Sequence, residues 1–220
     1  MSETQDKLNE QLFNVIKNNK DSDEAKLKKI KYLVYLGADV HQKDERGKTM
    51  LIRAAERGEA EVVKYFIEQG VDVEQKDNFG YSALRWAVNF GYIDVVKYLA
   101  QGGANMKVKD EMGQTMLMLA AEKGHLEVVK YLAQNGADVN EKNVYEDTAL
   151  DIARNWRNND CQKFLEELQP KEVAKEPYEA KVEVLSEHKD KAKKEVLEGK
   201  PQDEKMEKGS FWKRIFGGRN

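Results

Sequence analysis

The amino-acid sequence repeats itself every 33 residues, and this period constrains the fold more than any other feature. An Asp-x-x-Gly segment recurs at residues 44–47, 77–80 and 110–113. Two further sets of glycines keep the same step: Gly58, Gly91 and Gly124, then Gly70, Gly103 and Gly136. A period of this length indicates a small supersecondary unit that cannot bury its apolar face alone. Stacked units bury a continuous core, so the sequence predicts a solenoid.

Each unit has the local signals of two short helices. A Thr or Ser after the turn can cap the first helix, which contains alanines where backbones must approach closely and stops at a glycine. The second helix has apolar residues at helical spacing, such as Val62, Val63 and Phe66, and acid–base pairs such as Glu127 and Lys130 on its solvent side. The sequence therefore predicts an all-α fold of helix pairs joined by turns.

These residues resemble the ankyrin repeat, most closely from Gly124 to Leu132 and from Gly136 to Asn140. The likeness covers about residues 8–168. It implies an ankyrin-repeat solenoid with β-turn fingers, in which the turn tips and first helices form a concave face that binds protein partners. The Pro and His of the family's T-P-L-H segment are both absent, as in Thr49-Met-Leu-Ile52. The resemblance therefore implies a stack that lacks the hydroxyl–imidazole hydrogen bond of that segment.

The period divides the chain into a stack and a tail. We expect regular repeats at residues 44–76, 77–109 and 110–142, an N-terminal helical capping unit at 1–43 and a degenerate C-terminal capping repeat at 143–168. End units should be atypical because each has one face without a neighbour. Charged residues dominate residues 169–208, and all three prolines lie beyond residue 169, so we expect a mostly disordered linker there.

The resemblance also points to candidate partner-binding residues, because it places certain turn and helix positions on the concave face. Large apolar, charged and polar side chains stand at these positions. They are Arg46, Lys48, Arg57, Phe79, Tyr81, Phe90, Met112, Gln114, Lys123, Tyr145 and Trp156. Exposed apolar patches indicate binding, and aromatic residues supply many interface hot spots. The alternative is that the rings pack between adjacent fingers and stiffen the stack. Trp86 replaces an inward apolar residue, and we expect it in the core.

The last segment, residues 209–220, contains a short basic amphipathic motif. Its members are Phe211, Trp212, Lys213, Arg214, Ile215 and Phe216, with the four apolar side chains on one helical face. Such a motif is typical of segments that dock into a partner groove or make a weak peripheral contact with an anionic membrane. Folding back onto the repeats is the alternative.

The remaining features of the sequence argue against other classes of protein. A net charge of −3 does not favour a nucleic-acid ligand, and no apolar run is long enough to cross a bilayer. The single cysteine, Cys161, fits a reducing compartment and a core position. His125 takes a packing position, and no catalytic, phosphate-binding or metal-binding motif occurs. We therefore expect a cytoplasmic, non-enzymatic protein without metal or cofactor, which the absence of a signal peptide also favours.

Three functional hypotheses follow. The first is a monomeric scaffold that binds a protein partner through the concave face. The second is an adaptor in which the motif at residues 211–216 docks on a membrane or partner groove. The third is a structural protein that self-associates.

Overall fold

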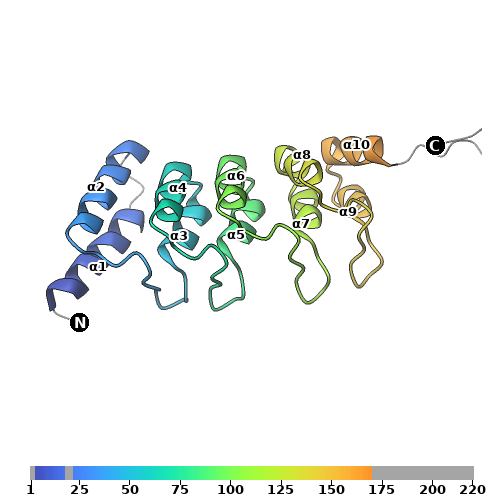
Figure 1. Cartoon of the computed structure of the whole chain (residues 1–220). Helices are drawn as coiled ribbons and strands as arrows, with labels where there is room; N and C mark the ends of the chain where they lie inside the picture. The colour runs from blue at the N-terminus through green and yellow to red at the C-terminus, as the bar shows by residue number, and fades with distance from the viewer. Residues whose placement is uncertain (1–2, 18–21, 170–220) are drawn as a thin grey trace, which may run out of the picture. The chain divides into compact units, whose positions relative to one another are not determined.

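A computed structural model describes residues 3–17 and 22–169 of the chain, and within these ranges the regular elements are helices arranged in consecutive pairs (Figure 1). The pairs are α1 (Glu3–Lys17) and α2 (Asp23–Tyr35), α3 (Met50–Arg57) and α4 (Ala60–Glu68), α5 (Ala83–Phe90) and α6 (Ile93–Gln101), α7 (Met116–Lys123) and α8 (Leu126–Gln134), and α9 (Ala149–Asn155) and α10 (Asn159–Leu168). The predicted all-α class is confirmed for the described residues.

The predicted helix signals act as expected at the start and end of the first helices. The side chains of Thr49, Ser82, Thr115 and Thr148 each accept a hydrogen bond from the backbone N–H three residues later. Gly58, Gly91 and Gly124 end three of these helices in the left-handed conformation. A glycine is favoured there because a Cβ atom is strained at positive φ.

A turn segment precedes each of α3, α5, α7 and α9, and we call these segments fingers 1 to 4. They comprise residues 39–49, 72–82, 105–115 and 138–148. In each finger one turn side chain accepts hydrogen bonds from the backbone two and four residues later. In finger 2 the Asp77 Oδ1 accepts from Phe79 at 2.9 Å and from Tyr81 at 3.0 Å. Fingers 1 to 3 are also closed by isolated antiparallel bridges such as Lys76 with Ser82.

The core is a continuous apolar layer between the helices of each pair and between neighbouring pairs. Alanines such as Ala54, Ala87 and Ala120 are fully buried in the first helices, which lets the backbones approach closely. Cys161 is buried in α10 as predicted. The His125 Nε2 lies 3.0 Å from the carbonyl oxygen of Asn89 in the preceding pair, so this histidine joins two repeats.

The last pair departs from the glycine pattern where no further repeat follows. Glu146 and Arg157 have φ values of 65° and 58° and stand where the earlier units have glycine. In the interior, a Cβ at Gly91 would lie 2.4 Å from the His125 ring of the next unit. At Glu146 and Arg157 no following repeat lies within residues 3–17 and 22–169 to supply such a neighbour. Only the intrinsic strain of the left-handed conformation then opposes a non-glycine residue.

The expectations for residues 169–208 and 209–220 fall almost wholly outside the described residues, which end at Gln169. Within the described ranges, none of the helices is both long and apolar enough to cross a membrane.

Candidate protein-binding surface

The fingers and the adjoining sides of the first helices form one face of the stack, which we call the finger face (Figure 1). Most of the candidate binding residues are exposed. Those exposed are Arg46, Phe79, Phe90, Met112, Lys123, Tyr145 and Trp156, and those half-buried are Arg57, Tyr81 and Gln114. The apolar members leave large areas in solvent, since Phe79 is 63% and Trp156 is 61% exposed.

Five aromatic rings of one repeat lie in contact from the tip of finger 2 to the end of α5. We call this series Phe79, Tyr81, Trp86, Phe90 and Tyr92 the aromatic column. Successive ring centroids are 6.4, 5.7, 5.9 and 5.9 Å apart, and the Trp86 and Phe90 rings are stacked. Tilted, edge-on and offset arrangements at these distances are favourable for aromatic pairs. The rings therefore pack on one another within a repeat, whereas the alternative reading had them packing between adjacent fingers.

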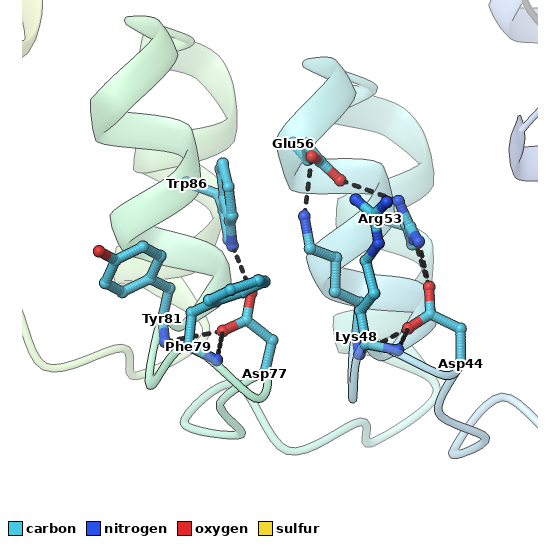
Figure 2. Close-up of polar contacts among 9 residues, drawn as sticks. Asp44, Lys48, Arg53, Glu56, Asp77, Phe79, Tyr81 and Trp86 are labelled. Carbon is cyan, nitrogen blue, oxygen red and sulfur yellow. Dashed lines mark hydrogen bonds and ion pairs between the residues drawn. The ribbon is translucent and has the colours of Figure 1, made fainter.

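A buried carboxylate holds the lower part of the column in place. The Asp77 Oδ2 accepts a 2.9 Å hydrogen bond from the Trp86 Nε1, while its Oδ1 fixes the backbone of Phe79 and Tyr81 (Figure 2). One side chain thus sets both the turn and the direction of the indole. A rigid aromatic surface loses little conformational entropy when a partner binds.

The repeat before the aromatic column carries charged residues at the same positions. Arg53, the counterpart of Trp86, donates from its Nε to the Asp44 Oδ2 at 2.7 Å and pairs with Glu56 (Figure 2). Burial disfavours the charged form of Asp44. Hydrogen bonds from Arg53 and from the backbone of Lys48 and Arg46 outweigh this effect, and the pKa of the carboxyl lies below its ordinary value.

The expectation that Lys48 presents its side chain on the surface is wrong. Lys48 is only 2% exposed, because its Nζ lies 3.8 Å from the centroid of the Trp86 ring and 2.8 Å from the Glu56 Oε1. The indole of the following repeat covers the lysine. Gln114, at the same turn position in repeat three, donates from its Nε2 to the Glu122 Oε2 at 2.7 Å. Lys48 and Gln114 therefore bond to neighbouring side chains of the protein and hold the surface residues in place.

A groove of about 410 Å3 lies between fingers 2 and 3, beside the aromatic column. Its apolar wall includes Phe79, Tyr81 and Met112, and Met116 lies deeper. Two basic side chains that line it are already paired: Arg85 with Asp110 at 3.2 Å and Lys109 with Glu141 at 2.7 Å. Lys76 and Glu111 line the groove as well, and both are exposed. The opposite charges along the groove therefore balance, and its apolar part suits an uncharged side chain.

Sequence reasoning placed Trp86 in the core, and the indole does pack against the core. It is only half-buried and forms the centre of the aromatic column. The spacing of residues in α5 could have indicated that Trp86 belongs to this column. Trp86 and Phe90 are four residues apart and so share one face of α5, and that face also carries the exposed Phe90.

Among the described residues there is neither a cluster of metal ligands nor an activated cysteine. Across residues 3–17 and 22–169, no group of three or more His, Cys, Asp or Glu side chains could hold a metal ion. Burial raises the pKa of the Cys161 thiol, which makes it a poor nucleophile. The motif at Phe211, Trp212, Lys213, Arg214, Ile215 and Phe216 lies outside the described part of the chain.

Comparison with known families agrees with this architecture. The family described as ankyrin repeats (3 copies) matches residues 22–110 and 102–172, which span both the fingers and the helix pairs. No curated protein matched the chain. The family match covers more than half of the sequence, and the chain therefore belongs to the ankyrin-repeat family.

Proposed function

We propose that this protein is a non-enzymatic scaffold that binds a protein partner through the finger face, with the aromatic column as the anchor. Ankyrin repeats are in general protein–protein interaction modules. The observation that supports the proposal most directly is the continuous aromatic surface from Phe79 to Phe90, of which both ends are exposed. Contiguous exposed apolar surface on a folded domain usually marks an interaction site.

The arrangement of the column fits the way interfaces are built. Hot spots are enriched in aromatic residues and arginine, and they cluster at the centre of an interface inside a polar rim. Repeat one supplies the polar rim with Arg46 and Arg57, and repeat three supplies it with Lys123. Tyr145 and Trp156 in the last repeat extend the apolar surface along the same face.

The test is affinity capture from a native lysate with the full chain as bait. The variant Phe79→Ala/Phe90→Ala removes two exposed rings and leaves Trp86, Asp77 and the turn intact. We expect it to retain the helical signal and to lose roughly 1–3 kcal/mol of stability, because it removes the ring contacts of Phe79 with Tyr81 and of Phe90 with its two neighbours. Partner recovery should fall at least tenfold, corresponding to about 1.4 kcal/mol of binding free energy.

The matched control removes exposed rings from another part of the same fold. Tyr32 and Tyr35 on α2 are 61% and 85% exposed, so Tyr32→Ala/Tyr35→Ala deletes similar apolar surface away from the fingers. This variant should recover the partner like the unmodified chain. Equal recovery by both variants, or loss of the partner only in the α2 variant, would contradict the proposal.

A further inference from the structure

Fingers 2 and 3 lack a hydrogen bond that joins the other neighbouring fingers. The Asn78 N–H of finger 2 donates to the Arg46 carbonyl of finger 1 at 3.0 Å, and the Val144 N–H of finger 4 donates to the Met112 carbonyl of finger 3 at 3.0 Å. Shifted by the 33-residue period, the equivalent bond between fingers 2 and 3 would run from the Glu111 N–H to the Phe79 carbonyl. No backbone hydrogen bond links these two groups in the described structure.

The turn glycines show the same opening independently. A Cβ at Gly47 in finger 1 would lie 2.2 Å from the Asn78 side chain, and one at Gly113 in finger 3 would lie 3.3 Å from the Asn143 backbone. A Cβ at Gly80 in finger 2 would meet nothing within 4 Å. Figure 1 also shows the fingers before α5 and α7 farther apart than their neighbours on either side. The groove beside the aromatic column occupies this opening.

The bases of the same two fingers are held together. The Asn105 N–H donates to the Glu74 Oε1 at 2.8 Å, and Arg85 of α5 pairs with Asp110 of finger 3 at 3.2 Å. Fingers 2 and 3 therefore remain in contact below their tips, although the tips are apart. The opening exposes a free backbone acceptor on one side, a free backbone donor on the other, and apolar side chains between them.

We propose that this groove takes an extended peptide segment of the protein partner, which supplies the two hydrogen bonds that fingers 2 and 3 do not make with each other. Consecutive residues of an extended chain direct their N–H and C=O groups to opposite sides. One peptide N–H therefore donates to the Phe79 carbonyl, and the next residue's carbonyl accepts from the Glu111 N–H. This inference rests on the proposed function and adds the chemistry of the ligand.

The groove also selects the side chain of the bound peptide. A large apolar side chain fits between Phe79, Tyr81 and Met112, because burial against apolar surface favours it. Asp110 and Glu141 already neutralise Arg85 and Lys109. Lys76 and Glu111 also line the groove, but both are exposed. An ion pair with either of them would be screened by solvent and would gain little, whereas a charged peptide side chain placed between the rings would lose hydration. Backbone bonds give affinity and the pocket gives specificity, as in other cases where a strand is added to an exposed edge.

The test is a titration of the full chain with blocked pentapeptides, followed residue by residue with amide NMR. The probes are five-residue threonine peptides whose central residue is Trp, Leu, Asp or Lys. The Trp and Leu peptides should shift the Glu111 amide and slow its hydrogen exchange at least tenfold at saturation. The amides of Asn78 and Val144 already have acceptors and serve as internal controls, and their exchange should not change. The Asp and Lys peptides keep the same backbone groups but should bind roughly tenfold more weakly, because their charged side chains lose hydration in the groove.

Two further changes, one in the peptide and one in the protein, distinguish recognition of the peptide backbone from simple apolar contact. N-methylation of the central Trp residue removes one peptide N–H. It should weaken binding roughly 3- to 10-fold, the effect of about 0.7–1.4 kcal/mol for one net hydrogen bond. Met112→Ala should weaken the Trp peptide, whereas Tyr145→Ala, an exposed ring on finger 4, should not.

Several results would overturn the inference. Slow exchange of the Glu111 N–H in the free chain would mean that the fingers close on each other in solution. Peptide shifts confined to Phe90 and Trp86, or equal binding of the N-methylated peptide, would mean that the groove does not take a backbone. If the partner is still captured through Phe79 and Phe90 in that case, the proposed function stands and the peptide-groove inference alone fails.

Discussion

The Lys48 ammonium group lies over the Trp86 indole, with its Nζ 3.8 Å from the ring centroid, although the two residues belong to successive repeats. The same Nζ is 2.8 Å from the Glu56 Oε1, so the cation is held between a carboxylate and an aromatic face (Figure 2). Cation–π attraction is strongest for tryptophan and for desolvated cations. The contact links the charged surface of repeat one to the aromatic column of repeat two.

The first prediction is that Lys48 and Trp86 are energetically coupled. We expect a double-mutant cycle of Lys48→Met and Trp86→Leu to give a coupling of about 1–2 kcal/mol in chemical denaturation. Leucine is chosen because Leu119 occupies the place of Trp86 in repeat three. A matched cycle of Lys97 and Trp86, with Lys97 on the solvent side of α6, should give a coupling near zero. Additivity in the first cycle would contradict a direct contact.

The second prediction concerns the buried ion pair of Lys26 and Glu59, which joins the capping helix α2 to repeat one. Both residues are buried, and one Glu59 oxygen has no hydrogen-bond partner among the described groups. Removing one member of such a pair leaves an uncompensated charge. We therefore expect Lys26→Met to cost roughly 3–5 kcal/mol, and Lys26→Met/Glu59→Leu to recover most of this loss. Urea denaturation would measure both. A Lys26→Met variant as stable as the double variant would contradict this prediction.

The pH dependence of the Lys26→Met variant follows from the same burial. Burial raises the pKa of Glu59 above its ordinary value of 4.5 even with Lys26 present. A carboxyl with a raised pKa in the folded state stabilises the fold below its ordinary pKa and loses that contribution as the pH rises. The deficit of Lys26→Met should therefore be largest near neutral pH and shrink toward pH 4.5. A deficit that grows on acidification would contradict this assignment.

The stability loss caused by Asp44→Asn should show the opposite pH dependence. Asn143 makes the same turn bonds with its Oδ1, at 2.9 and 3.0 Å, so Asp44→Asn preserves the turn and removes mainly the charged contact with Arg53. Because the pKa of Asp44 is lowered in the fold, its contribution is present above 3.8 and is lost as the pH falls through the folded-state value. We expect a loss of roughly 1–2 kcal/mol at pH 7 that disappears in acid. Asp94→Asn, at an exposed position on α6, is the control and should show neither effect.

The overall fold could be predicted because its causes are local and recur in every unit. The sequence of one repeat contains the hydroxyl residue that caps the first helix and the glycine that ends it. It also contains the helical spacing of apolar residues that form the buried face. The surface could be predicted less well because it depends on contacts between repeats. Lys48 has the turn position of an exposed residue, and only the indole 38 positions later buries it.

The opening between fingers 2 and 3 could not have been predicted from the sequence. All three regular fingers share the Asp-x-x-Gly pattern, so nothing in the turn residues marks Gly80 as different from Gly47 or Gly113. The difference arises from how neighbouring repeats are placed relative to each other. That placement sums many small packing contributions, and no single residue encodes it.

The final prediction uses two glycines with the same backbone conformation and different surroundings. Gly91 and Gly70 have φ values of 77° and 76°, so alanine carries a similar strain of roughly 1–2 kcal/mol at either position. A Cβ at Gly70 meets nothing within 4 Å, whereas one at Gly91 would lie 2.4 Å from the His125 ring. Gly91→Ala should therefore lose clearly more stability than Gly70→Ala, with a further cost of about 1–3 kcal/mol from overpacking. Thermal and chemical denaturation would measure this difference.

The His125→Ala background separates steric cost from backbone strain. Once the imidazole is absent, Gly91→Ala should cost about as much as Gly70→Ala, because only the left-handed conformation still opposes the methyl group. If Gly91→Ala remains the more harmful change in that background, the histidine is not what requires a glycine. Equal losses from the two substitutions in the unmodified chain would contradict the close packing of repeats two and three at this point.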